Sequence, residues 1–219
     1  MKAIRPKVND KFVEILLAKI NCEYEPEEVP VIIEAYAKLG NCYMNVEEKV
    51  NRDGGKVHYG WKIYQTKVLC EAERHAVWEN EEGDLIDITP NDDDDKQILF
   101  VSDNNFVYTG QLVDNVRVNI TDNPLVEDLI LVCESLEKFY ACGRRIDDEQ
   151  IGVPEPAAKM IYIYSKLKNA YLAYIHSGNR PNSKCLCGNT KNYKNCHGLT
   201  LRQNIKADLK SLKKSIKVI

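Results

Sequence analysis

A run of cysteine, histidine and glycine near the C-terminus constrains this chain more than any other feature. Residues 185–198 read CLCGNTKNYKNCHG, so that Cys185 and Cys187 are followed, after eight residues, by the adjacent pair Cys196 and His197. Thiolate and imidazole are the ligands that zinc prefers, and four of them complete the tetrahedral shell of a closed structural site. The run therefore predicts a structural Zn²⁺ held by these four side chains. The alternative is four free side chains without a metal.

The same run resembles the SEC-C motif, a short zinc-binding module found in many otherwise unrelated bacterial proteins. Besides the four ligand positions, the pattern C-x-C-G-x-x-x-x-Y-x-x-C-H-G is matched at Gly188, Tyr193 and Gly198. The resemblance implies zinc and, by analogy, a docking surface for a protein or a nucleic acid. It implies nothing about the rest of the chain.

Charge divides the chain into an acidic body and a basic C-terminal part. Residues 156–219 contain thirteen Lys or Arg and a single acidic residue, whereas residues 1–155 contain seventeen basic and thirty-two acidic residues. A basic segment attracts polyanions and acidic surfaces. We therefore expect residues 184–217 to contact RNA, the ribosome or an acidic protein. Attraction between the two parts of the chain itself is the alternative. The sequence does not indicate an oligomeric state.

The sequence predicts a cytoplasmic protein that is not associated with a membrane. Asp10 and Glu14 interrupt the apolar run near the N-terminus, so we expect neither a signal peptide nor a spanning helix there. No other segment approaches the roughly 20 uninterrupted apolar residues that a spanning helix needs. The eight cysteines come without any sign of secretion, which argues against a disulfide framework.

Hydrophobic periodicity and turn signals predict an α+β fold with a helical N-terminal part, a central antiparallel sheet, packed helices and a small C-terminal zinc knuckle. Helices are expected at residues 9–21, 27–39, 42–51, 125–141, 155–176 and 199–217, and strands at residues 57–64, 68–79, 84–89, 98–101, 106–108 and 116–120. A run of turn-forming residues, 177–182, serves as a linker. We therefore divide the chain into an α+β body, residues 1–178, and a basic zinc module, residues 179–219.

The body contains a second pattern with chemical potential. Cys42 opens an expected helix, where exposed N–H groups and the helix dipole stabilise a thiolate. His75 and Asp87 follow on consecutive expected strands. A thiol nucleophile, a base and an acidic residue that orients the base are the parts of a nucleophilic site. Asn45, one helical turn from Cys42, is a candidate donor to an oxyanion together with backbone N–H groups.

Two stretches of this pattern resemble transglutaminase-like enzymes, and the order of the three residues also resembles that of papain-like enzymes. The stretches HAVW (75–78) and LIDITP (85–90) are similar to the H-A-W and D-x-x-P segments of the transglutaminase-like core. The resemblance implies a cysteine-dependent hydrolase or acyltransferase acting on amide or ester bonds. His75 would deprotonate Cys42, the thiolate would attack a carbonyl, and Asp87 would orient the imidazole. Such chemistry needs no metal, so the zinc would remain structural.

Strand register leaves a structural interpretation open for these residues. A symmetric hairpin centred on residues 82–83 would pair Asp87 with Trp78 rather than with His75, and a slip of one residue turns a side chain to the opposite face. In that case Cys42 and His75 are buried residues without a catalytic role, and Asp87 caps the end of a strand.

Two further alternatives concern the chemistry and the class of protein. Glu71, Glu73 and His75 alternate along one expected strand and so share a face, which makes them candidate ligands of a metal, with His58 as a further ligand. A non-enzymatic adaptor that docks on nucleic acid, the ribosome or an acidic protein through its basic zinc module is the alternative to an enzyme.

Overall fold

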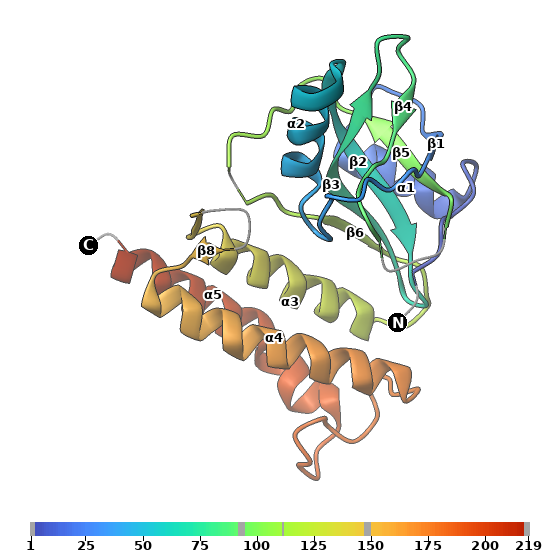
Figure 1. Ribbon diagram of the computed structural model, residues 1–219. Helices are drawn as coiled ribbons and strands as arrows, with labels where there is room; N and C mark the ends of the chain where they lie inside the picture. Colours follow the sequence, from blue (N-terminus) through green and yellow to red (C-terminus); the bar gives the residue numbers. More distant parts are fainter. Residues whose placement is uncertain (1–2, 92–94, 111, 147–149, 217–219) are drawn as a thin grey trace. The chain divides into compact units, whose positions relative to one another are not determined.

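The computed structural model describes the chain except for residues 1–2, 92–94, 111, 147–149 and 217–219. The described residues form two compact units (Figure 1). The sheet unit contains residues 1–109 and 115–120, and the helical unit contains residues 110–114 and 121–219. An antiparallel sheet and five α-helices confirm the predicted α+β class.

The sheet unit is built on six strands, all paired antiparallel, in the order β1-β5-β2-β3-β4, with β6 also paired to β3. The strands are β1 (Glu27–Pro30), β2 (Lys56–Gln65), β3 (Leu69–Glu79), β4 (Leu85–Ile86), β5 (Gln97–Ser102) and β6 (Val116–Asn119). β2 and β3 pair along their whole length, whereas β6 pairs with residues 69–72 of β3 and β4 only with residues 78–79. Among the described strands, none covers the outer edge of β3 between these two contacts.

Two helices pack on one face of this sheet. Helix α1 (Lys11–Ile20) buries Val13 and Leu16 against Cys70 and Ala72 of β3. Helix α2 (Cys42–Asp53) packs against Ala76 of the same strand. Side chains of a strand point alternately to its two faces, so the even-numbered residues of β3 share the face that these helices cover. His75 and Glu79, as odd-numbered residues of β3, therefore belong to the opposite face of the sheet.

One predicted helix of the sheet unit is wrong. The sequence predicts a helix at residues 27–39, but residues 27–30 form edge strand β1, with Val29 opposite Ile98 of β5. Val29 is fully buried with Val77, Ile98 and Phe100, and this burial outweighs the local helix preference. Pro30 fits the end of an edge strand, where a missing N–H interrupts no ladder.

The predicted strand at residues 106–108 is also wrong. These residues form no regular element, and their aromatic rings pack onto α2 instead. The ring of Tyr108 stacks on that of Tyr43 with centroids 3.8 Å apart, and Phe106 lies 6.3 Å from Tyr43. Aromatic residues suit both a strand and a side-chain cluster, so composition alone does not separate the two.

The helical unit consists of α3 (Leu125–Tyr140), α4 (Glu155–His176) and α5 (His197–Ile216), with the short elements β7 (Arg144–Arg145), β8 (Ile151–Gly152) and the 3₁₀ turn η1 (Tyr193–Asn195). α3 and α4 pack on one another, and α5 contacts both. α5 contributes Leu201, Ile205 and Leu212 to the interior, at the spacing of one helical face. The three helices lie close to their predicted bounds. None of the described helices is both long enough and apolar enough to cross a membrane.

The division into units differs from the one drawn from sequence. The sequence predicts that the body ends at residue 178, whereas α3 and α4 belong to the same compact unit as the cysteine-rich run.

Candidate functional site

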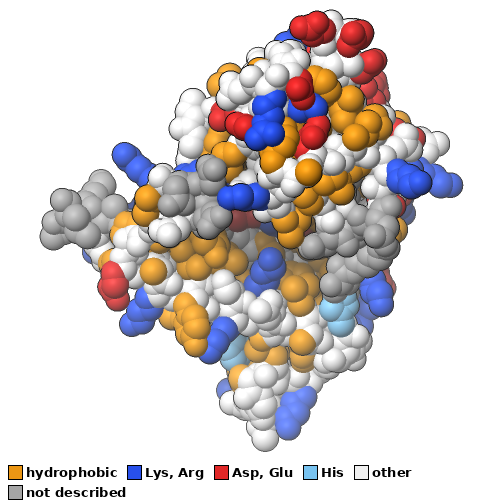
Figure 2. Space-filling model, in the orientation of Figure 1, with side chains coloured by type: hydrophobic (Ala, Val, Ile, Leu, Met, Phe, Trp, Pro, Cys, Tyr) orange, Lys and Arg blue, Asp and Glu red, His pale blue; other side chains and the backbone are white. Residues whose placement is uncertain are grey.

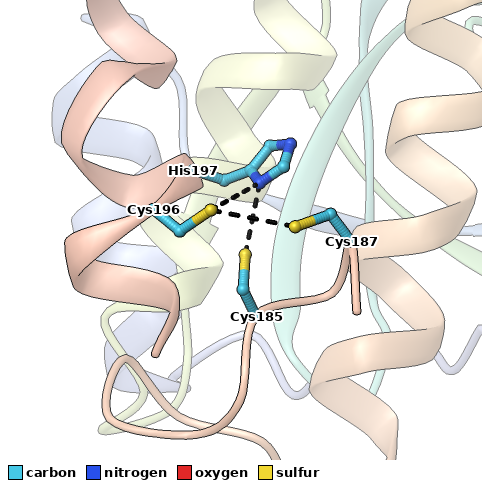
Figure 3. Close-up of side chains that lie close together, drawn as sticks. All are labelled: Cys185, Cys187, Cys196 and His197. Atoms are coloured by element: carbon cyan, nitrogen blue, oxygen red, sulfur yellow. Dashed lines mark hydrogen bonds between the residues drawn. The ribbon is translucent and has the colours of Figure 1, made fainter. Parts of the chain in front are cut away.

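Four side chains of the helical unit bring their ligand atoms together, as Figure 3 shows. The ligand atoms of Cys185, Cys187, Cys196 and His197 all lie within 4.8 Å of one another. Sγ of Cys187 is 3.7 Å from Sγ of Cys196, and Nδ1 of His197 is 3.2 Å from Sγ of Cys185. Sulfurs that share a tetrahedral zinc at about 2.3 Å lie about 3.8 Å apart, whereas a disulfide needs about 2.05 Å. The cluster has the dimensions of a tetrahedral metal site.

The backbone folds tightly around this cluster. The N–H of Gly188 donates to the carbonyl of Cys185 at 2.9 Å, and Gly188 has φ +80°, a conformation that favours glycine. The N–H of Cys185 donates to the carbonyl of Lys191, which closes the loop between the two ligand pairs. Cys196 follows the turn η1, and His197 is the first residue of α5.

Tyr193 attaches the loop to the helices behind it. Its side chain is 2% exposed, and its hydroxyl lies 2.7 Å from that of Tyr171 on α4 and 2.8 Å from Oδ2 of Asp128 on α3. A buried hydroxyl with two partners holds its neighbours in fixed positions. The sequence signalled Tyr193 through the motif but gave no sign of Asp128 or Tyr171, because their roles arise only when the helices pack.

The charges of the four side chains favour the binding of a cation. Burial by itself raises the pKa of the Cys185 thiol, but the backbone N–H groups of Cys187 and His197 lower it below its usual range. Desolvation and the adjacent thiols of Cys185 and Cys187 raise the pKa of Cys196 to about 11. Three thiolates at this separation repel one another, and a bound divalent cation removes that repulsion. The cluster could hold a metal ion, and three sulfurs with one imidazole nitrogen form a donor set of the zinc type.

The sheet unit brings Cys42, His75 and Asp87 together. Nε2 of His75 lies 3.1 Å from Oδ1 of Asp87, and the Cys42 sulfur lies close enough to His75 to help raise the pKa of the imidazole. All three residues are less than 9% exposed, and Asp87 is fully buried.

Asp87 reaches His75 because the pairing of β3 and β4 departs from a regular hairpin. Trp78 lies opposite Ile86, so the symmetric hairpin that would pair Trp78 with Asp87 is not formed. After Ile86 the chain leaves β3, and the N–H of Asp87 donates to the carbonyl of Pro30 at 2.9 Å. The N–H of Ile32 in turn donates to the carbonyl of Asp87, and this pairing with residues 30–32 holds the Asp87 carboxylate beside the imidazole of His75.

Electrostatics favour an ionised pair of His75 and Asp87. Burial alone lowers the pKa of His75, but the adjacent Asp87 carboxylate and Cys42 sulfur raise it to about 10. Burial raises the pKa of the Asp87 carboxyl, yet the charge of His75 and the N–H of Thr89 bring it below its usual value. The contact is a charge pair more than an aligned hydrogen bond, because Nε2 has no hydrogen-bond partner in the described part of the chain.

Asn45 is close to this group, but its side-chain amide and oxygen already have hydrogen-bond partners. Its Nδ2 donates to the carbonyl of Lys38 at 2.8 Å and to Oγ1 of Thr89 at 3.1 Å, and its Oδ1 accepts from the N–H of Lys38. Both amide hydrogens therefore have acceptors. The contact with Thr89, two residues beyond Asp87, makes Asn45 a support for the acidic residue in this structure.

The alternative metal ligands on β3 are not brought together. Glu71 pairs with Arg117 at 2.7 Å and accepts from Asn115, and His75 is paired with Asp87. His58 bonds to Glu79 and to Ser102. Within the described residues, the Cys185–His197 cluster is the one group of three or more such ligands close enough to hold an ion.

Comparisons of the chain with known protein families, with curated proteins and with solved structures found no match.

Proposed function

We propose that this protein is a cysteine-dependent hydrolase or acyltransferase that acts on amide or ester bonds, and that its helical unit holds a structural zinc ion. The observation that carries the proposal is the convergence of Cys42, His75 and Asp87 from a helix start, a long strand and an irregular segment. Buried titratable groups with strongly shifted pKa values gather at functional sites more often than elsewhere.

The reaction assigns one role to each residue. Cys42 at the N-terminus of α2 attacks the carbonyl carbon as a thiolate, and His75 holds the proton taken from it. His75 then gives this proton to the leaving amine or alcohol, and a thioester remains on Cys42. Water or a second nucleophile, deprotonated by His75, releases the acyl group. The Asp87 carboxylate keeps the imidazole oriented and stabilises its charge.

Backbone groups are the donors left for the oxyanion. Both amide hydrogens of Asn45 are engaged, so the N–H groups at the start of α2 would carry this role. The zinc, held by four protein ligands, leaves no open position for a substrate. It supplies folding energy to the helical unit and no chemistry to Cys42.

Alkylation of Cys42 tests this proposal. In the metal-loaded protein near pH 7, iodoacetamide is expected to modify Cys42 faster than Cys22, although Cys22 is the more exposed of the two. Cys70 is expected to react slowest, because burial raises the pKa of its thiol to about 11. The variant His75→Gln should slow the modification of Cys42 at least about tenfold, since the imidazole stabilises the thiolate. A Cys42 rate that is unchanged in this variant would contradict the proposal.

A specific observation also favours the second candidate function, an adaptor that docks on RNA, the ribosome or an acidic protein. Exposed lysines follow the zinc-binding loop and α5, namely Lys191, Lys194, Lys210, Lys213 and Lys214. The one acidic side chain of α5, Asp208, is engaged by the hydroxyl of Tyr164 at 2.9 Å. The solvent side of α5 is therefore basic.

Binding to RNA at several salt concentrations separates the two functions. An adaptor of this kind should lose affinity steeply as salt rises, and should lose it at every salt concentration when these five lysines are replaced by glutamine. Replacing three lysines of the sheet unit, Lys7, Lys11 and Lys67, is the matched control and should change little. Binding that is independent of salt, or insensitive to the five lysines, would count against an adaptor.

A further inference from the structure

A second histidine of the sheet unit connects a serine hydroxyl to a carboxylate. Nε2 of His58 lies 2.8 Å from Oγ of Ser102, and Nδ1 of His58 lies 2.8 Å from Oε2 of Glu79. Both ring nitrogens therefore have a partner at hydrogen-bonding distance. None of the three residues belongs to the group around Cys42.

Strand register produces this arrangement. Ser102 of β5 lies opposite Gly60 of β2, and His58 is two residues before Gly60, on the same face. His58 lies opposite Val77 of β3, and Glu79 is two residues further along that face. Both contacts are thus diagonal neighbours across paired strands. We call Ser102, His58 and Glu79 the relay. Its three residues lie on the paired strands β5, β2 and β3, so no loop is needed to position them.

The carboxylate fixes the direction of the hydrogen bonds. Burial alone would raise the pKa of Glu79, but hydrogen bonds from Lys56 and His58 lower it, so that Glu79 is ionised. Nζ of Lys56 lies 2.9 Å from Oε1 of Glu79. An ionised carboxylate only accepts, so Nδ1 of His58 donates to it, and Nε2 is then the nitrogen placed to accept the hydroxyl proton of Ser102. This is the tautomer that a general base for a serine requires.

The relay forms part of the wall of a cavity of about 550 Å³. β1 contributes Glu27 and Glu28 to the lining, and the turn between β3 and β4 contributes Asp84. Acidic side chains gather at this end of the sheet unit in Figure 2, at the top of the view. Ser102 is 8% exposed and lines this open cavity together with His58 and Glu79. Glu28 pairs with Arg5 and Glu79 with Lys56, so Glu27 and Asp84 are the lining carboxylates without a basic partner in the described part of the chain. These two carboxylates favour a ligand that carries a positive charge.

We propose that Ser102 is a second nucleophile, activated by His58 and Glu79, that reacts with acyl or phosphonyl groups of ligands carrying a positive charge. Oγ of Ser102 forms the new bond to the carbonyl carbon while its proton passes to Nε2 of His58. The bond to the leaving alcohol breaks, and the alcohol takes the proton from His58. Water then hydrolyses the ester on Ser102 by the same route and restores the hydroxyl. This inference does not depend on the role of Cys42.

Covalent labelling in a Cys42→Ala background tests the proposal without touching the relay. Two fluorophosphonate probes are compared, one neutral and one with a quaternary ammonium group, and the modified residue is identified by peptide mass spectrometry. We expect an adduct on Ser102, formed at least about fivefold faster with the cationic probe. His58→Gln should slow the labelling about 100-fold or more, a range typical for loss of a general base.

Two controls make the result decisive. Ser135→Ala removes another buried serine, whose hydroxyl donates to Leu131 within its own helix, and should leave the labelling unchanged. Ser102→Ala should abolish it, with the thermal unfolding of that variant recorded in parallel. The absence of an adduct on Ser102, or an adduct that forms at the same rate in His58→Gln, would overturn the proposed nucleophile. Equal rates for the two probes would overturn the charge preference.

Discussion

Replacing Cys187 by serine is expected to remove the metal from the protein and to unfold the C-terminal part of the helical unit. Wild-type protein purified with zinc should carry one ion per chain, while the affinity of the variant should fall at least about 1,000-fold, because three ligands no longer close the shell. Metal content measured by mass spectrometry and the helical circular dichroism signal on heating are the two readouts.

The unfolding should extend beyond the loop itself. His197 is both a ligand and the first residue of α5, and Tyr193 bonds to Tyr171 of α4 and Asp128 of α3. Loss of the metal frees the two remaining thiols, Cys185 and Cys196, and with them the segment that carries Tyr193. The buried hydroxyls then lose partners, at a cost of about 1–3 kcal/mol for each unsatisfied group. We therefore expect the melting of all three helices of this unit to shift.

Cys142→Ser is the matched control for this experiment. Cys142 lies just after α3 in the same unit, is half-buried, and its thiol contacts the carbonyl of Lys138 at 3.5 Å. This variant should retain the full metal content and nearly the wild-type melting curve. If Cys187→Ser keeps its metal, or if Cys142→Ser loses it equally, the assignment of the ligands is wrong.

The sequence predicted the cluster well for a physical reason. All four ligands lie within thirteen residues, so the chain between them is too short to carry them far apart, and the donor types alone point to a metal. The long elements were also predictable. β2, β3, α3 and α4 combine strong periodicity with clear turn signals, and their observed bounds fall within a few residues of the expected ones.

Features that depend on contacts between distant segments were not predictable. β1 is a strand because Val29 pairs and packs with Ile98, sixty-nine residues further along the chain. The relay of Ser102, His58 and Glu79 depends on the register of three strands, and no local pattern announces it. The contact of His75 with Asp87 arises because the chain stops pairing with β3 after Ile86. A regular hairpin continued beyond this point would place Asp87 beside a different residue of β3.

Replacing Asp87 by asparagine should have the largest effect on the reactivity of Cys42. The neutral amide no longer balances the imidazolium, so the pKa of His75 falls from about 10 and less positive charge remains beside Cys42 at neutral pH. We expect the alkylation rate of Cys42 at pH 7 to fall about 10- to 100-fold. Breaking a buried pair should also destabilise the sheet unit by about 3 kcal/mol. Alkylation kinetics and urea unfolding measure the two effects.

The destabilisation caused by Asp87→Asn should depend on pH, in the direction given by the pKa shifts of His75 and Asp87. The pKa of His75 is raised in the folded protein from 6.5, so its contribution is complete below about pH 6.5 and is lost as pH rises through about 10. The pKa of Asp87 is lowered from 3.8, so its contribution is present above about pH 4 and is lost as pH falls further. The difference in stability between wild type and Asp87→Asn should therefore be largest between about pH 4 and 6.5 and should shrink in alkali.

A matched variant and a double-mutant cycle distinguish the pair from a general loss of charge. Asp103→Asn removes a carboxylate of the same unit that is paired with Arg74 at 2.6 Å, and it should leave the alkylation of Cys42 within about twofold of wild type. His75→Gln combined with Asp87→Asn should cost less than the sum of the two single changes, because each single change already breaks the pair. Additive costs, or a stability difference that grows above pH 10, would show that Asp87 and His75 do not act as a charge pair. In that case Asp87 would serve the fold through its bonds to Thr89 and Pro30, and the orientation of His75 would need another explanation.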